Sequence, residues 1–170
     1  MPKINRIFLT RVFALVLVMI LGLSFTACFA KSFKASGAGI KYNKTFKLGK
    51  TTTEKNLKKA LGKYTRKQYD GCTCGVASYV YNFKAKGVKI ETLKRTASSK
   101  EEIISIIITK RGVPTIGGLR VGDKVSKIPK VYGNNCSKSG KTYTYTSGSL
   151  TLTISTKNGK IKKITMTKDV

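Results

Sequence analysis

The chain has 170 residues, of which 34 are lysine or arginine, 7 are aspartate or glutamate and none is histidine, for a formal net charge of +27 at pH 7. Without histidine the chain lacks the commonest general base and a frequent metal ligand. When the three basic residues before position 12 are set aside, the rest carries +24, which favours anionic partners such as lipid head groups, cell-wall phosphate polymers or nucleic acid.

Residues 1–30 have the layout of a secretory signal. Lys3, Arg6 and Arg11 precede an apolar run over 12–25, and small residues follow in 26–30. Such a run is short for a membrane span, which needs about 20 apolar residues. We predict a signal peptide over 1–30, with a retained membrane anchor as the alternative. The protein is then exported, and is either secreted or attached to the outer face of the cytoplasmic membrane.

Two processing routes are open for this segment. Simple cleavage after Ala30, which we favour, removes Cys28 with the signal. Residues 25–28 also resemble a lipobox, in which Cys28 would be acylated and would hold the domain at a membrane surface. Phe25 stands where leucine is usual in that motif.

The next segments predict a tether and then a helix. Residues 31–44 are small, polar and basic and indicate a flexible basic tether. A capping box at 51–54 and the apolar spacing over 57–61 predict a helix that ends at Gly62.

Three strands are predicted after this helix. Alternation indicates strands over 79–83 and 88–93. The isoleucine run within 103–109 indicates a strand buried on both faces, and hence a central one.

A glycine-containing connector, 110–118, leads to a second set of elements. Helical spacing over 125–132 predicts a short helix that Ser126 caps, because Pro129 is tolerated only in a first turn. Strands are expected over 142–146, 150–156 and 160–167. Asn158-Gly159 predicts a two-residue hairpin turn, and the odd spacing of Ile161 and Ile164 indicates a bulge or a two-sided strand.

The two sets of elements read as a tandem repeat. The helix pattern of 57–62 returns at 128–133, and an alternating tyrosine strand follows each copy. We predict an α+β fold of two tandem α-β-β-β units, with antiparallel sheet and the helices packed on one face. The expected organisation is a signal peptide at 1–30, the tether at 31–44, a first repeat at 45–109, the connector at 110–118 and a second repeat at 119–170.

The motifs that carry this repeat are residues 48–54, 61–63, 122–123, 132–133 and the closing segment 158–164. With these motifs the chain resembles the tandem-repeat β-lactamase inhibitor proteins, and is similar to the small lipoproteins of outer-membrane β-barrel assembly. The resemblance implies a protein that works by presenting a sheet face or a loop to a protein partner.

Three cysteines follow the signal: Cys72, Cys74 and Cys136. Thiols outside the cell tend to oxidise in pairs, so we expect a disulfide from Cys72 or Cys74 to Cys136, with one thiol left over. A redox pair of Cys72 and Cys74 is a weaker interpretation, because redox motifs normally have two intervening residues. We expect no metal site, because three sulfurs without histidine do not complete the usual set of four ligands.

The candidate binding surface consists of four tyrosines from the two alternating strands, although core packing beneath the helices is an equal alternative. Lysines are spread through every segment, which is also typical of a solvated surface. The four are Tyr79, Tyr81, Tyr143 and Tyr145.

The sequence thus predicts an exported, non-enzymatic binding module at the cell envelope. It would present a basic, tyrosine-bearing sheet surface to a protein or a polyanion, with no catalytic residue, cofactor, nucleic acid or small-molecule substrate. The alternatives are a membrane-tethered structural or assembly lipoprotein and a thiol oxidoreductase that uses Cys72 and Cys74.

Overall fold

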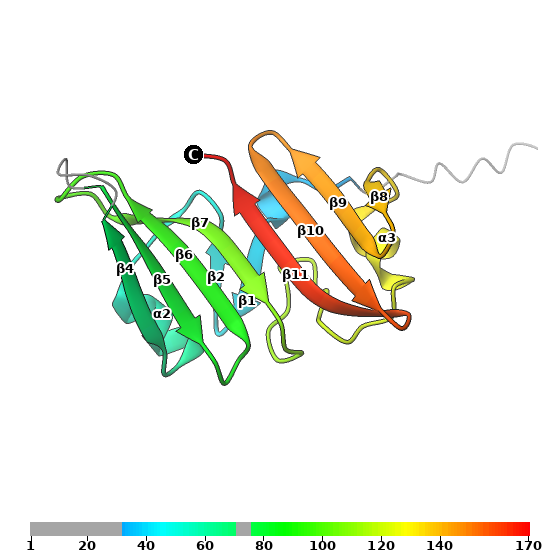
Figure 1. The fold of residues 1–170 in the computed structure, drawn as a ribbon, viewed down its shortest axis with the longest axis horizontal. Helices are drawn as coiled ribbons and strands as arrows, with labels where there is room; N and C mark the ends of the chain where they lie inside the picture. The colour runs from blue at the N-terminus through cyan, green and yellow to red at the C-terminus, as the bar shows by residue number, and fades with distance from the viewer. Residues whose placement is uncertain (1–31, 71–75) are drawn as a thin grey trace, which may run out of the picture. The chain divides into compact units, whose positions relative to one another are not determined.

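The fold is built mainly of β-strands. A computed structural model describes residues 32–70 and 76–170 (Figure 1), and this part is 48% strand and 12% helix. The predicted α+β class with tandem α-β-β-β units is therefore wrong. Four antiparallel strands, not three, follow each α-helix, and all of them belong to one nine-stranded sheet.

Each of the two helices opens a meander of four strands. The first set is α2 (Glu54–Leu61), β4 (Thr65–Asp70), β5 (Ala77–Phe83), β6 (Val88–Lys94) and β7 (Glu101–Ile108). The second set is α3 (Lys127–Tyr132), β8 (Ser137–Ser139), β9 (Thr142–Ser147), β10 (Leu150–Lys157) and β11 (Lys160–Lys168). The strand order β4-β5-β6-β7-β11-β10-β9-β8 places the last strand of each meander at the centre.

The two meanders meet where β7 pairs with β11. Ile106 lies opposite Met166 and Ile108 opposite Ile164, and these four side chains have no solvent exposure. The short strand β3 (Thr51–Thr52) pairs with the first residues of β7. The central position predicted for the isoleucine strand is confirmed.

The N-terminal part of the domain is not the predicted flexible tether. It forms a 3₁₀ turn, η1 (Ala35–Gly37), and a hairpin of β1 (Gly39–Tyr42) and β2 (Lys44–Lys47). Ile40 is fully buried and Phe46 is nearly so, and Ile40 bridges to Thr115 in the connector. Its few apolar side chains anchor this segment, although its average composition is polar.

The helices and the β1–β2 hairpin lie on one face of the sheet, which we call the covered face; the other is the open face (Figure 1). Helix α2 is capped by Thr53, which accepts from the amide of Asn56 at 3.3 Å. The predicted capping box is wrong, because Thr51 and Thr52 lie in a strand. Helix α3 is the shorter helix, as its proline predicts.

The predicted hairpin and bulge are both confirmed in β10 and β11. Asn158 and Gly159 have φ of 52° and 69°, which their small or absent side chains tolerate. The register shifts beyond Ser155, so Ile161 and Ile164 are both buried. The bulge leaves Lys162 and Lys163 exposed side by side.

The predicted signal peptide and the lipidation site Cys28 lie outside the described residues, so both stay predictions. Within residues 32–70 and 76–170, no helix combines the length and the apolar character that a membrane span requires.

The junction of the meanders predicts a strong difference between two neighbouring isoleucines. Ile106→Ala leaves a cavity in the core and should lower the free energy of unfolding by about 3 kcal/mol. Ile107→Ala, on the half-buried open face, should cost about 1 kcal/mol. Urea unfolding of both variants measures this, and equal losses would contradict the assignment of the faces.

Candidate functional site

Three of the four tyrosines proposed as a binding surface lie in the core. Tyr81 and Tyr145 are 0% and 1% exposed and Tyr79 is 8% exposed, while Tyr143 is half-buried against the core. Their alternation directs all four to the covered face, where Tyr81 packs on Tyr64 near α2. The predicted tyrosine-bearing surface is therefore wrong for these three, and core packing was the correct alternative.

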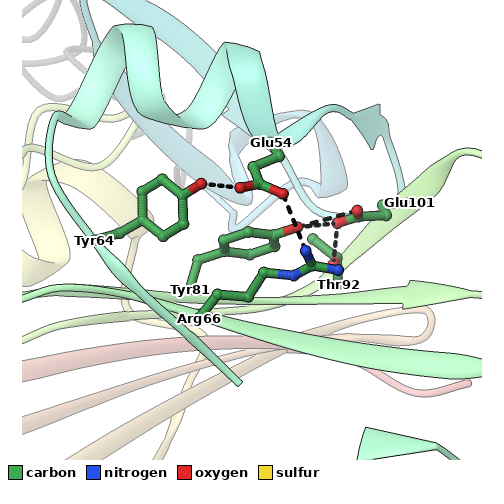
Figure 2. Close-up of polar contacts among 6 residues, drawn as sticks. All are labelled: Glu54, Tyr64, Arg66, Tyr81, Thr92 and Glu101. Atoms are coloured by element: carbon green, nitrogen blue, oxygen red, sulfur yellow. Dashed lines mark hydrogen bonds and ion pairs between the residues drawn. The ribbon is translucent and has the colours of Figure 1, made fainter. Parts of the chain in front are cut away.

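Tyr81 belongs to a network of hydrogen bonds beneath α2 (Figure 2). Its hydroxyl donates to both oxygens of Glu101 at 3.0 and 2.9 Å, and the hydroxyl of Thr92 donates to the same carboxylate at 2.7 Å. Burial, together with the bond to Glu101, raises the pKa of Tyr81 well above its usual value. The phenol therefore remains a protonated donor at neutral pH.

A second carboxylate, Glu54 in the first turn of α2, completes the cluster in Figure 2. It accepts from the hydroxyl of Tyr64 and from Nη1 of Arg66 at 3.2 Å. The hydrogen bond to Glu54 raises the pKa of Tyr64, and the Arg66 guanidinium lies 4.2 Å from the ring centroid of Tyr79. These contacts tie the start of α2 to β4 and β5.

The other half of the covered face has its own aromatic cluster. The ring centroid of Tyr132 in α3 lies 5.7 Å from that of Phe33 and 5.8 Å from that of Tyr145. Burial raises the pKa of Tyr132 to about 12, and its hydroxyl donates to Oγ1 of Thr115 at 2.7 Å. The hydroxyl of Tyr145 donates to the carbonyl of Gly133 at 2.8 Å. The polar ends of both buried phenols are satisfied.

A cavity of about 400 Å³ lies beside α3. Its lining includes Tyr143, Tyr145 and the half-buried thiol of Cys136, and the amine of Lys138 lies 5.2 Å from the ring centroid of Tyr143. The lining has no carboxylate and no histidine. Two tyrosines from the candidate surface therefore border this cavity.

The structure does not test the predicted disulfide, because Cys72 and Cys74 lie outside the described residues. The strands that flank them, β4 and β5, stand at one end of the strand order, and Cys136 precedes β8 at the other end. The disulfide to Cys136 therefore stays a prediction.

Away from the β10–β11 turn, the open face of the second meander is neither basic nor aromatic. The register of β9, β10 and β11 directs alternate residues away from the covered face, and these are mainly threonines. The expected basic sheet face is therefore absent here, and the charge must lie elsewhere. The threonines are Thr142, Thr144, Thr146, Thr151, Thr153, Thr165 and Thr167.

Ten exposed cations lie at one end of the sheet, which we call the basic end, and other exposed cations lie elsewhere, including on α2. The β5–β6 turn, the chain leaving β7 and the β10–β11 turn all lie there, at the lower edge in Figure 1. Lys124 joins them by a bridge to Lys160. The exposed residues of the basic end are Lys84, Lys89, Lys110, Arg111, Lys124, Lys141, Lys157, Lys160, Lys162 and Lys163.

Among the described residues, the carboxylates form no ion pair with the basic end, although Asp123 lies close enough to Arg111 to interact with its charge. Glu102 binds Lys168 and lies 3.6 Å from Arg95, and Asp123 binds Lys127 at 2.7 Å. Glu54, in the first turn of α2, and Glu101 have the partners described above, and Glu91 accepts from the hydroxyl of Ser78. Within residues 32–70 and 76–170, no ion pair includes a residue of the basic end.

Comparisons with protein-family models, curated proteins and solved structures found no match. The resemblance to the tandem-repeat inhibitor proteins has no support from these comparisons and stays a prediction. Among the described residues, no group of three histidine, cysteine, aspartate or glutamate side chains could hold a metal ion.

Sequence reasoning missed the basic end because the lysines are evenly spread along the chain. A signal was nevertheless present. Short segments with lysine or arginine, 84–89, 110–111 and 157–163, fall at the end of one strand or the start of the next. Only the strand order shows that these connections share one end of the sheet.

The network beneath α2 predicts that removing one phenol hydroxyl weakens the fold. Tyr81→Phe takes a donor from a half-buried carboxylate and should cost about 2 kcal/mol of unfolding free energy. The matched change Tyr69→Phe, at a side chain that is 54% exposed, should stay within about 0.5 kcal/mol. Chemical denaturation compares the two, and an equally small effect at Tyr81 would show that its bonds to Glu101 contribute nothing.

The pair of Glu102 and Lys168 predicts a pH dependence. The hydrogen bond from Lys168 holds the pKa of Glu102 below its usual 4.5, so the pair stabilises the fold above pH 4.5 and this contribution is lost as pH falls through the lower folded value. Glu102→Gln should cost roughly 1 kcal/mol at pH 7 and progressively less below pH 4.5. Unfolding measured from neutral to acid pH tests this, and a constant difference would contradict it.

Proposed function

We propose that this protein is an exported, non-enzymatic binding module of the cell envelope, whose basic end binds the phosphate groups of an anionic envelope polymer. The observation that supports this function is the basic end itself. Exposed lysines from separate connections lie together at one end of the sheet, and no carboxylate among the described residues pairs with them.

Such a cluster has an energetic cost without a partner. Like charges that lie close together repel one another and destabilise the compact state. An anionic polymer would remove this repulsion and release its own counterions on binding. The cluster therefore suits a partner that carries many negative charges in a row.

The predominance of lysine over arginine in the basic end favours a phosphate polymer as the partner, rather than a partner recognised by a defined planar geometry. Arginine is the residue suited to planar, bidentate recognition, whereas lysine is a compact point charge on a flexible stem. All residues of the basic end except Arg111 are lysines. Point charges suit a repeating phosphate backbone, where position along the polymer matters little.

The β10–β11 hairpin provides a rigid base for part of this surface. The turn at Asn158 and the bulge beyond Ser155 set three lysines on a short, regular stretch of backbone. These are Lys160, Lys162 and Lys163, all exposed. The N-terminal signal layout supports a partner outside the cytoplasm.

Neutralising this hairpin should weaken binding to a polyglycerol phosphate polymer. The triple change Lys160→Gln, Lys162→Gln and Lys163→Gln should raise the Kd roughly a hundredfold, at about 1 kcal/mol per cation near an anionic surface. Wild-type binding should weaken steeply from about 50 to about 200 mM salt, because screening removes the attraction. Fluorescence anisotropy with labelled polymer measures both.

The matched control removes the same charge from α2. Lys55, Lys58 and Lys59 are exposed on the outer face of that helix and are not among the residues of the basic end. Their triple change to glutamine should leave most of the affinity intact. If both triple variants lose equal affinity, the binding depends only on net charge and the role of the basic end is contradicted. If the wild-type protein does not bind the polymer at low salt, the proposed function is excluded.

A further inference from the structure

A notch on the open face lies at the basic end, where the β5–β6 turn meets the chain leaving β7. Its volume is about 330 Å³, at the small end of the range for ligand sites, roughly 300–1,000 Å³. Lys84, Lys89 and Lys110 line it, together with the side chain of Asn82 and an apolar floor that includes Ile107. Three cations and an amide therefore surround one small hollow.

The backbone holds these lysines together. The amide of Thr109 donates to the carbonyl of Gly87 at 2.8 Å, and the amine of Lys110 donates to the carbonyl of Lys84 at 3.0 Å. Two segments far apart in sequence are thus fixed against each other. The lysines meet because of these bonds and not through chance contact of flexible side chains.

Gly87 makes this close approach possible. Its φ is +63°, and a Cβ at this position would lie 2.4 and 2.6 Å from Cγ and Cβ of Lys110. Any larger residue would be strained and would also displace Lys110. The glycine therefore serves both the turn and the position of the third cation.

The three lysine amines that line the notch have N–H groups that form no hydrogen bond with the described residues. Lys110 uses one of its three N–H groups on Lys84 and retains the others. Lys84 and Lys89 make no side-chain hydrogen bond or ion pair within residues 32–70 and 76–170. Glu91, the carboxylate that follows Lys89 on the same face, accepts from Ser78.

We propose that this notch is a phosphate-binding subsite, which seats one phosphate group between Lys84, Lys89 and Lys110. A tetrahedral anion can accept from three amines at once, and Asn82 can supply a further N–H. β11 continues the basic surface, since the register beyond the Ile108–Ile164 pair leads to Lys163. The inference rests on the proposed function and names the place where a phosphate of the polymer is held.

Pyrophosphate, used alone, tests the subsite on the protein purified after expression of the full chain. Bound ligand stabilises the fold, so Tm should rise by about 3 °C or more at saturation. The triple change Lys84→Gln, Lys89→Gln and Lys110→Gln should abolish this rise, while the α2 triple variant Lys55→Gln, Lys58→Gln and Lys59→Gln keeps it. A rise of wild-type size in the notch variant would overturn the proposal.

The variant Gly87→Ala tests the position of Lys110 independently of the net charge of the protein. It removes no lysine but displaces Lys110, so the rise in Tm with pyrophosphate should shrink although the net charge is unchanged. A full rise in this variant would overturn the geometric argument. If the alanine variant does not fold, the notch triple variant decides alone.

Binding of the polymer and of phosphatidylglycerol vesicles then separates this inference from the proposed function. If wild type binds the polymer and the notch variant matches the α2 control, the subsite is wrong and the function stands. If pyrophosphate stabilises only through the notch but the polymer does not bind, the function is wrong and the subsite stands. Loss of polymer or vesicle binding in the notch variant supports the subsite and identifies the source of the phosphate.

Discussion

The pairing of β7 with β11 is the contact on which the rest of the structure depends. It joins two meanders, each held together by hydrogen bonds between strands close in sequence, into one sheet. An antiparallel meander sends alternate connections to the same end. Because β7 and β11 also pair antiparallel, the β5–β6 turn and the β10–β11 turn come to the same end of the sheet. The gathering of lysines there is a consequence of this junction.

The covered face explains why so little acidic or aromatic surface remains. Phe33 contacts the aromatic cluster near α3, and the β1–β2 hairpin reaches the connector through Ile40, so the N-terminal segment serves both halves of the core. Near the start of α2, the carboxylates of Glu54 and Glu101 accept from phenol, hydroxyl and guanidinium groups. The carboxylates act within the fold, and lysines remain on the surface.

Local signals in the sequence were sufficient for several elements and insufficient for others. The helix before Gly62, the turn at Asn158 and the bulge near Ile161 follow from residues within a few positions of one another, and each was predicted. The edge strands β4 and β8 were missed because they are mostly polar and exposed and carry no apolar alternation. The segment predicted as a tether was misjudged because Ile40 is buried by partners distant in sequence.

The sequence by itself determined the strong positive charge, the local turns and helices, and the alternation that sets Tyr79 and Tyr81 on one side of a strand. It did not determine which side is covered, because that depends on where α2 and the β1–β2 hairpin pack. The tertiary structure decided that side, the single sheet and the meeting of Lys84, Lys89 and Lys110. The reason is physical: strand order and register are set by long-range pairing, and a pattern read along one strand does not specify its neighbour.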